Sequence, residues 1–301
     1  MLKMHRKTDA GSKRTGVISE MDYKGLHGKA LYWILFALLC IAVAVSLIPP
    51  LYVFVSSVKD TKEFYQIPPT IIPKTVDLSK IVEVWKRYDF KRYYLNTAFV
   101  AVFSVTWSLF SNGLAGYVLS KIKPRGHKIV FALVMASLMI PTTISIVPLY
   151  KNFVSFPIGG FSMINTYFPM ILMTGCNAFM VIVYKSFFDG IPTDLLDAAE
   201  IDGCGTVAKF CHIVAPLSKS VLATGAILAF NATWNDFFWP YLVLKESSKA
   251  TVMIEIFAVR GSVSQDKLLV LLAFAILPPA LIFIFFQKNI MQGLTMSGIK
   301  G

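Results

Sequence analysis

Long stretches without charged residues alternate with polar segments along the chain. They cover residues 30–58, 93–120, 129–150, 152–184, 221–235 and 268–287. A helix needs about 20 apolar residues to cross the hydrocarbon core of a bilayer, and five of the six stretches reach that length. The remaining stretch is interrupted by Asp236 but continues to Leu244. The pattern predicts an all-α, polytopic membrane protein with six transmembrane helices, since barrel strands would alternate in polarity over about 10 residues.

The basic residues predict the orientation of these helices. The short segment 121–128 holds Lys121, Lys123, Arg125 and Lys128, and residues 1–29 hold seven further basic residues. Short basic loops stay on the cytoplasmic side, so both termini are expected inside. The segment 59–92 argues the other way with eight basic residues, but it is long and also carries five acids.

Two polar segments are then expected on the outer side. Segment 59–92 contains Pro68, Pro69 and Pro73, which disfavour one long helix. It is either a surface for an extracellular partner or a plain connector. Segment 246–267 contains a short amphipathic piece near residues 253–259.

Composition agrees with a membrane protein: 55% of residues are hydrophobic, 15% are charged and the mean hydropathy is +0.63. Soluble domains carry about 25% charged residues. The net charge of +12 comes from residues at the ends of the apolar stretches rather than from one basic surface, so no nucleic-acid partner is expected.

Cys204, Cys211 and His212 lack the spacing of a zinc site, and no metal is expected. Residues 1–29 are expected to form a cytosolic tail rather than a cleaved signal peptide.

The polar segment 190–220 has the pattern of two short helices joined by a hinge. The first is expected to begin after an N-cap at Thr193 or Asp194 and to end at Gly203, which allows the left-handed conformation. Residues at i, i+3, i+4 spacing share one of its faces: Leu195, Ala198, Ala199 and Asp202. The second is expected to be capped by Thr206 and stopped by Pro216. Its apolar stripe is predicted to contain Val207, Phe210, Cys211 and Val214.

Charge on the first short helix favours a protein partner over a lipid surface. A helix lying on a membrane carries lysine and arginine on its polar face. This one carries acids instead, at Asp194, Asp197, Glu200 and Asp202. The two alanines make its face shallow, which suits insertion of the helix into a groove of another protein.

This segment resembles the cytoplasmic loop of binding-protein-dependent ABC import permeases. The family pattern is Glu-Ala-Ala, three residues, Gly, nine residues, Ile, one residue, Leu-Pro. The matching positions here are Asp197, Ala198, Ala199, Gly203, Ile213, Ala215 and Pro216. Asp197 replaces the usual glutamate and Ala215 the usual leucine, so the carboxylate and the apolar site are kept. Residues 48–52, 139–141, 148–150, 165–166 and 231–244 are similar to the carbohydrate-uptake branch, in particular the second membrane subunit of maltose-type importers.

The resemblance implies a type I ABC importer permease fold, with a permease domain over residues 30–301 in the bacterial plasma (inner) membrane. It also implies a second homologous permease in a heterodimer, two cytosolic ATPase subunits and an extracellular solute-binding protein. The ATPase would use ATP and Mg, because this chain has no Walker-type loop and is expected to bind no cofactor and catalyse no reaction. Asp197 would pair with the ATPase and Gly203 would set the angle between the two helices. The residues expected at the ATPase contact are Asp197, Ala198, Ala199, Asp202, Gly203, Val207, Phe210 and Pro216.

A second group of polar and aromatic residues lies in the fifth apolar stretch. A charge at mid-membrane costs about 2.5–3.5 kcal/mol on insertion scales, so Asp236 is expected to face the bundle interior or water. Amides, a carboxylate and aromatic rings suit a sugar pathway, but a role in helix packing explains them equally well. The candidates for lining the pathway are Asn231, Trp234, Asn235, Asp236 and Trp239.

Three other kinds of function are compatible with a chain of this apolar character. Importers of polyols or glycerol-phosphate compounds share these motifs with sugar importers. A secondary transporter would show internal repeats, which are not evident, and it would leave segment 190–220 unexplained. An intramembrane enzyme would need catalytic pairs inside the spans, whereas all four histidines lie outside them.

Overall fold

The computed structural model describes residues 26–297, with side chains from 28 to 288. Within this range every regular element is a helix, apart from one isolated antiparallel bridge between Lys59 and Val76. The chain divides into two units after Tyr52, and α1 (Leu26–Ser57) is shared between them. In the first unit the described part of α1 exposes apolar side chains in all directions, as expected of a helix in an apolar solvent. The predicted tail 1–29 lies almost entirely outside the described residues.

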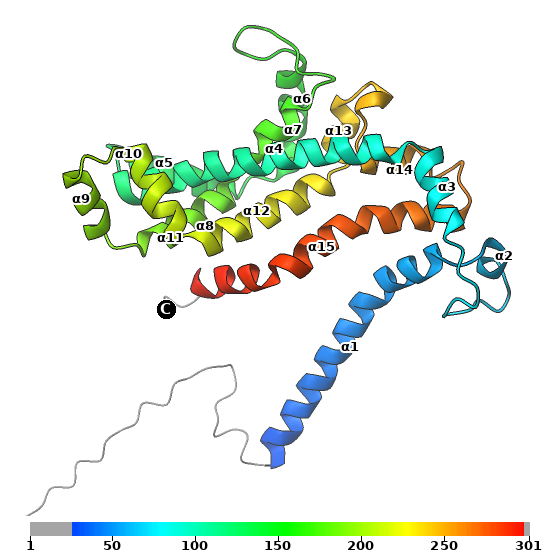
Figure 1. Cartoon of the computed structure of the whole chain (residues 1–301). Coiled ribbons are helices and arrows are strands. Elements are labelled where there is room, and N and C mark those ends of the chain that lie inside the picture. Colours follow the sequence, from blue (N-terminus) through cyan, green and yellow to red (C-terminus); the bar gives the residue numbers. More distant parts are fainter. Residues whose placement is uncertain (1–25, 298–301) are drawn as a thin grey trace, which may run out of the picture. The chain divides into compact units, whose positions relative to one another are not determined.

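The second unit is a helical bundle in which α4, α12 and α15 run side by side and α8 packs against α4 (Figure 1). Its helices are α2 (Thr61–Phe64), α3 (Ser79–Arg87), α4 (Phe90–Tyr117), α5 (His127–Ser137), α6 (Ile146–Val154), α7 (Phe168–Thr174), α8 (Ala178–Asp189), α9 (Asp194–Ile201), α10 (Thr206–Lys209), α11 (Ala215–Leu217), α12 (Lys219–Trp234), α13 (Phe238–Val243), α14 (Val252–Val259) and α15 (Gln265–Ser297).

Four helical segments are long and apolar enough to cross a membrane: Gly28–Ser57, Phe90–Ile122, Phe168–Asp189 and Gln265–Lys288. Two bent pairs qualify if each forms one span: His127–Ser137 with Thr142–Val154, bent by 99°, and Thr206–Leu217 with Lys219–Trp234, bent by 89°. The all-α prediction is confirmed. The described residues hold four to six spans, and the upper limit equals the predicted number.

The predicted fifth span, 221–244, is wrong as one continuous helix. α12 ends at Trp234, and α13 begins only at Phe238. Asp236 accepts a hydrogen bond from the Trp239 backbone N–H (3.3 Å), and such side-chain bonds compete with a regular helix. Pro240, which has no N–H to donate, further disfavours continuity.

The predicted fourth span begins too early. Residues 155–167 form no long helix, because Gly159, Gly160 and Asn165 all have positive φ angles. A helix cannot pass through such positions. The apolar run is therefore a loop followed by α7 and α8, which are themselves separated at Asn177.

Asn112 of α4 forms hydrogen bonds to backbone groups at the break between α7 and α8. Its side-chain amide donates to the Thr174 carbonyl (2.9 Å), and its side-chain oxygen accepts from the Asn177 N–H (3.0 Å). Asn112 is completely buried. Backbone groups in the hydrocarbon region must find partners within the protein, so this side chain makes the broken helix compatible with the membrane.

Tyr184 of α8 lies where α4, α8 and α12 cross, and it is completely buried. A Cβ atom on Gly116 would lie 2.8 Å from the Tyr184 Cβ, and a Cβ on Gly225 would lie 1.8 Å from the Tyr184 hydroxyl oxygen. Both glycines are therefore needed for this packing. Small residues allow membrane helices to approach closely.

A carboxylate organises the segment between α1 and α3. Glu63 accepts hydrogen bonds from the Thr70 hydroxyl (2.7 Å), the Lys74 N–H (2.8 Å) and the Thr75 N–H (2.9 Å). These bonds lower the pKa of Glu63 to about 2. The expectation that segment 59–92 is no single helix is confirmed, since it contains only the short α2 and α3 and the first residues of α4.

Candidate functional site

Segment 190–220 is called the coupling segment below, after the role that the family resemblance implies for it. Its first helix is α9, which runs from Asp194 to Ile201 as the sequence pattern predicts. Leu196 is buried against the bundle, whereas Leu195 is 46% exposed. The face that contains Leu195, Ala198, Ala199 and Asp202 is open to partners, with only Ala199 partly covered. Its side chains are short or apolar, so another protein can approach the helix closely.

The hinge after α9 has the predicted backbone conformation. Gly203 has a φ of +78°. The Gly203 N–H donates to the Glu200 carbonyl (3.0 Å) and the Cys204 N–H donates to the Ala199 carbonyl (2.8 Å). This pair of bonds is the Schellman motif, which satisfies the last carbonyls of a helix.

The second half of the segment differs from the prediction in its ends. Thr206 is the first residue of α10, and the N-cap position is Gly205. Pro216 does not stop the helix, because a π turn over Phe210–Val214 places it in the first turn of α11, where a proline needs no N–H donor. The chain bends after Leu217, before α12 begins at Lys219.

The predicted apolar stripe of the second helix is divided between two environments. Phe210 and Val214 are buried, whereas Val207 is 63% exposed and Cys211 is also exposed. The π turn adds a residue to one helical turn and so rotates the residues after it relative to those before it. The Phe210 ring packs against Tyr117 of α4 (5.4 Å between centroids) and Phe188 of α8 (6.3 Å). Phe210 thus anchors the coupling segment in the bundle.

An ion pair joins the two arms of the hinge. The Lys209 ammonium group lies 2.6 Å from the Glu200 carboxylate. The Lys209 side chain is only 11% exposed, while that of Glu200 is 74% exposed. Each group favours the charged form of the other, so the pKa of Glu200 is lowered and that of Lys209 is raised. This pair was not predicted from the sequence, although two opposite charges on either side of a predicted turn were a usable signal.

The five candidates for lining the pathway occupy different environments. Trp234 is buried, and its indole N–H donates to the Ala275 carbonyl of α15 (3.0 Å). The Asn235 side chain bonds to the Asn231 carbonyl (2.9 Å), and Asp236 binds the first turn of α13. Of the five, Trp239 alone lines one of the cavities described below.

That cavity, of about 520 Å³, lies at the break between α5 and α6. Ser137, Thr142 and Ser145, which carry hydroxyl groups, line it together with Phe238 and Trp239. The hydroxyl residues were not predicted, although they surround Pro141 and so mark the place where the helix is interrupted. The combination offers hydrogen-bond partners and aromatic surface to a ligand.

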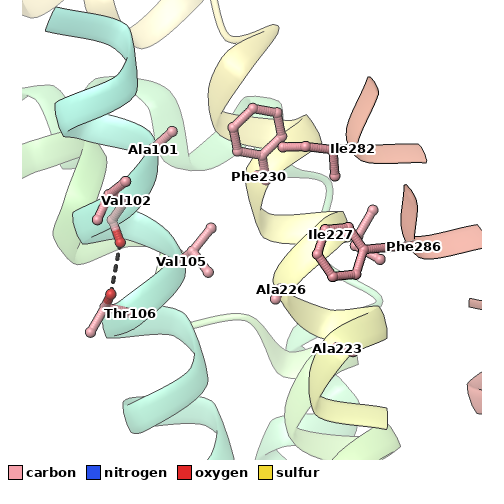
Figure 2. Close-up of a pocket in the computed structure, with 10 residues that line it drawn as sticks. All are labelled: Ala101, Val102, Val105, Thr106, Ala223, Ala226, Ile227, Phe230, Ile282 and Phe286. Carbon is pink, nitrogen blue, oxygen red and sulfur yellow. Dashed lines mark hydrogen bonds between the residues drawn. The ribbon is translucent and has the colours of Figure 1, made fainter. Parts of the chain in front are cut away.

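A second cavity, of about 370 Å³, is an apolar groove between α4, α12 and α15 (Figure 2). Its lining includes Val102 and Val105 of α4, Ile227 and Phe230 of α12, and Ile282 and Phe286 of α15. The hydroxyl of Thr106 donates to its own helix, at the Val102 carbonyl (2.8 Å). The lining offers no free polar group, so the groove suits apolar surface rather than a sugar.

Known transport proteins resemble this chain over most of its length. The model of the family described as binding-protein-dependent transport system inner membrane component matches residues 112–296, more than half of the chain. The arabinooligosaccharides transport system permease protein AraQ of Bacillus subtilis is 33% identical over 212 residues, 70% of this chain and 74% of AraQ. The sn-glycerol-3-phosphate transport system permease protein UgpE of Escherichia coli is 27% identical over 271 residues, 86% of this chain and 94% of UgpE.

A solved structure has the same fold. One chain of a bacterial ABC transporter involved in the import of the acidic polysaccharide alginate superposes with a TM-score of 0.74 at 24% identity. The match covers 91% of this chain and 99% of the other. A second structure of the alginate transporter, in complex with an alginate pentasaccharide-bound periplasmic protein, gives a TM-score of 0.58 at 15% identity.

Proposed function

Because this chain belongs to the binding-protein-dependent transport system inner membrane components, we propose that its coupling segment transmits ATPase motion to a sugar pathway in the helical bundle. The chain is a multi-pass, non-catalytic permease subunit of an ABC importer in the bacterial inner membrane. Because the chain belongs to this family, the two alternative functions considered from the sequence, a secondary transporter and an intramembrane enzyme, no longer apply.

One observation carries the proposed coupling role: α9 is exposed on its Ala198–Ala199 face while the next helical turns are buried in the bundle through Phe210. A rigid body that held α9 would therefore move α4 and α8 through the Phe210 contacts. Asp197 is exposed beside this face and is available to a basic group of the ATPase. Val207, Asp202 and Gly203 complete the exposed surface, whereas Phe210 serves as the anchor. Pro216 is also exposed and lies close to the bend that leads into α12.

The experiment that tests this role is crosslinking from Ala199→Cys to a co-expressed ATPase subunit, with the four native cysteines replaced. A crosslink that changes with ATP supports the docking of α9. Ser155→Cys, exposed in the loop between α6 and α7, is the matched control and should not crosslink. Absence of a crosslink at Ala199→Cys would remove the proposed coupling role.

We assign the coupling segment, and both chain termini, to the cytoplasmic side. The basic segment 121–128 and the coupling segment come together at one end of the bundle, since Lys121 donates to the Ile191 carbonyl (2.5 Å). A membrane-impermeant thiol reagent should label Ser155→Cys in intact cells and Ala199→Cys only after permeabilisation. The opposite pattern would reverse the orientation.

The remaining partners follow from the same proposal. A second homologous permease would form a heterodimer with this chain, two ATPase subunits would supply ATP hydrolysis with Mg, and an extracellular binding protein would deliver the solute. The exposed apolar groove between α4, α12 and α15 agrees with a bundle that is completed by another membrane protein. Copurification of the full complex in detergent tests this composition.

We assign the substrate to the sugars or oligosaccharides. The named substrate of AraQ is an oligosaccharide, and the cavity beside Trp239 combines hydroxyl groups with aromatic rings. UgpE carries the name of a glycerol-phosphate transporter, so a polyol or glycerol-phosphate compound is the alternative. No lysine or arginine is among the residues that line the cavity, which favours a neutral substrate over a phosphate ester. Competition of labelled oligosaccharide uptake by glycerol-3-phosphate distinguishes the two.

A further inference from the structure

A basic pocket lies where α4, α8 and the start of the coupling segment meet. Its volume is about 550 Å³, and Lys121, Lys123, Lys185, Ser120 and Asp189 line it. Three ammonium groups face one carboxylate, so the pocket carries net positive charge. We propose that it binds the phosphate group of an anionic phospholipid. We place this lipid in the cytoplasmic leaflet, and that placement rests on the proposed function. The binding of a phosphate group by the lysines is independent of it.

An irregular backbone brings two of the lysines together. Residues two apart point in different directions on a regular α-helix, yet Lys121 and Lys123 line the same pocket. α4 ends in a π turn over Val118–Ile122. Lys123 follows it with a φ of +49°, and its N–H donates to the Val118 carbonyl (2.9 Å). A left-handed conformation is uncommon outside glycine, and here it turns a second lysine into the pocket.

The single carboxylate is already engaged. Asp189 accepts a hydrogen bond from the Ser120 hydroxyl (2.7 Å) and forms an ion pair with Lys185 (2.7 Å). Within the described part of the chain no ion pair joins Lys123 to a carboxylate. The charge of Asp189 therefore offsets one of the three lysines, and an incoming phosphate would meet a positive pocket with the Lys123 ammonium group available to it.

The exposed apolar side chains beside the pocket favour a lipid over a soluble anion as its ligand. Lys185 lies one helical turn, about 6 Å, before the end of α8, and its ammonium group lies 4.9 Å from the Phe131 ring of α5. No described side chain of α5 is buried, and Ile129 and Leu133 are 69% and 65% exposed. An apolar surface for acyl chains thus begins beside the charged pocket. Basic pockets between membrane helices on the cytoplasmic side suit anionic headgroups.

Binding can be measured by native mass spectrometry of the full-length chain, titrated with dioctanoyl phosphatidylglycerol. Lys123→Gln should lower the affinity about fivefold, the effect of one basic residue near an anionic headgroup. Lys128→Gln is the matched control, because it removes the same charge from the same segment outside the pocket lining, and it should change the affinity less than about twofold. Asp189→Asn should raise the affinity, whereas simple structural damage would lower it.

Three results would overturn the proposal. Equal losses in Lys123→Gln and Lys128→Gln would indicate diffuse attraction without a pocket. Displacement of the lipid by inorganic phosphate at equal concentration would indicate a site for a soluble anion. Protection of Thr193→Cys, which lines the pocket and leaves all three lysines in place, from thiol reagents by the ATPase subunit, but not by lipid, would assign the pocket to the protein interface. The Ala199→Cys crosslink, measured in the Lys123→Gln background, separates failure of this site from failure of the coupling role.

Discussion

The ammonium group of Lys209 lies 2.6 Å from the carboxylate of Glu200, across the left-handed turn at Gly203. The pair joins α9, which carries the exposed face, to α10, which leads into the buried anchor at Phe210. It therefore fixes the angle between the part of the coupling segment that meets a partner and the part that meets the bundle.

Breaking this pair should weaken coupling. We expect Glu200→Gln to reduce ATP-driven uptake at least about twofold with little loss of folded protein, because the Glu200 side chain is 74% exposed and a glutamine oxygen can still accept a hydrogen bond from the largely buried Lys209. The double variant Glu200→Lys with Lys209→Glu should recover uptake. Glu83→Gln, which removes an acid paired with Lys267 near the other end of the bundle, is the control and should have no effect. Failure of the charge reversal to restore uptake would argue against a geometric role.

The hinge glycine should tolerate little change. An L-residue in the left-handed conformation costs about 1–2 kcal/mol, so Gly203→Ala should shift the ends of α9 and lower uptake several-fold. A Cβ atom added at Gly203 would have no heavy atom within 4 Å, so the effect would come from the backbone alone. Gly205→Ala is the control, because Gly205 has a φ of −69° and an equally open surrounding. Equal uptake by the two variants would contradict the assignment.

The crossing at Tyr184 gives a packing test. Gly225→Ala should destabilise the bundle by about 1–3 kcal/mol, the usual range for overpacking, since the new Cβ would meet the Tyr184 hydroxyl. That hydroxyl has no hydrogen-bond partner among the described residues. Tyr184→Phe should therefore be neutral or stabilising, and it should partly rescue Gly225→Ala. Thermal unfolding in detergent measures all three, and full additivity of the two changes would refute the contact.

The Glu63 carboxylate should make segment 59–77 sensitive to acid. Hydrogen bonds lower the pKa of Glu63 from 4.5 to about 2, so the folded segment favours the ionised form. Its contribution to stability is complete above pH 4.5 and is lost as the pH falls from 4.5 towards 2. Hydrogen exchange, corrected for the intrinsic rate, should show the amides of Lys74 and Thr75 opening over this range. In Glu63→Gln they should be open at all these pH values, whereas Glu83→Gln should behave as the unmodified chain does.

Substitutions in the cavity beside Trp239 should change the KM for the substrate and leave binding of the ATPase subunit unchanged. Thr142→Val and Ser145→Ala each remove a hydroxyl while keeping the side chain close to its original size. We expect a several-fold rise in the KM for sugar uptake, with docking of the ATPase unchanged. Thr106→Val is the control, since that hydroxyl lies in the apolar groove and bonds only to its own helix. A rise in KM for Thr106→Val but not for Thr142→Val or Ser145→Ala would contradict a substrate pathway through the cavity beside Trp239.

Local signals in the sequence predicted part of the coupling segment correctly. The start of α9, its exposed face and the left-handed Gly203 depend on residues within one or two turns. The register after Thr206 was wrong, because the π turn at Phe210 is stabilised by packing against Tyr117 and Phe188, which are distant in sequence. A proline usually ends a helix, and the sequence alone does not show the π turn that accommodates Pro216 within the helical segment.

The apolar stretches predicted the membrane class and the all-α fold but not where the helices break. Breaks at Asn177 and Asp236 depend on side chains that bind backbone groups, in the first case with help from Asn112 on another helix. Hydropathy averages over a window and does not register such bonds. Trp234 and Trp239 looked equivalent in the sequence, yet one is buried against α15 and the other lines a cavity.

The contact between Asn112 and the break at Asn177 also has a consequence for membrane insertion during synthesis of the chain. α4 precedes α7 and α8 in the chain, so it has been synthesised before the broken helix leaves the ribosome. The side chain that satisfies the exposed backbone is therefore available when that helix enters the bilayer. Replacement of Asn112 by an apolar residue should impair insertion of the nascent chain, rather than only lower the stability of the finished bundle.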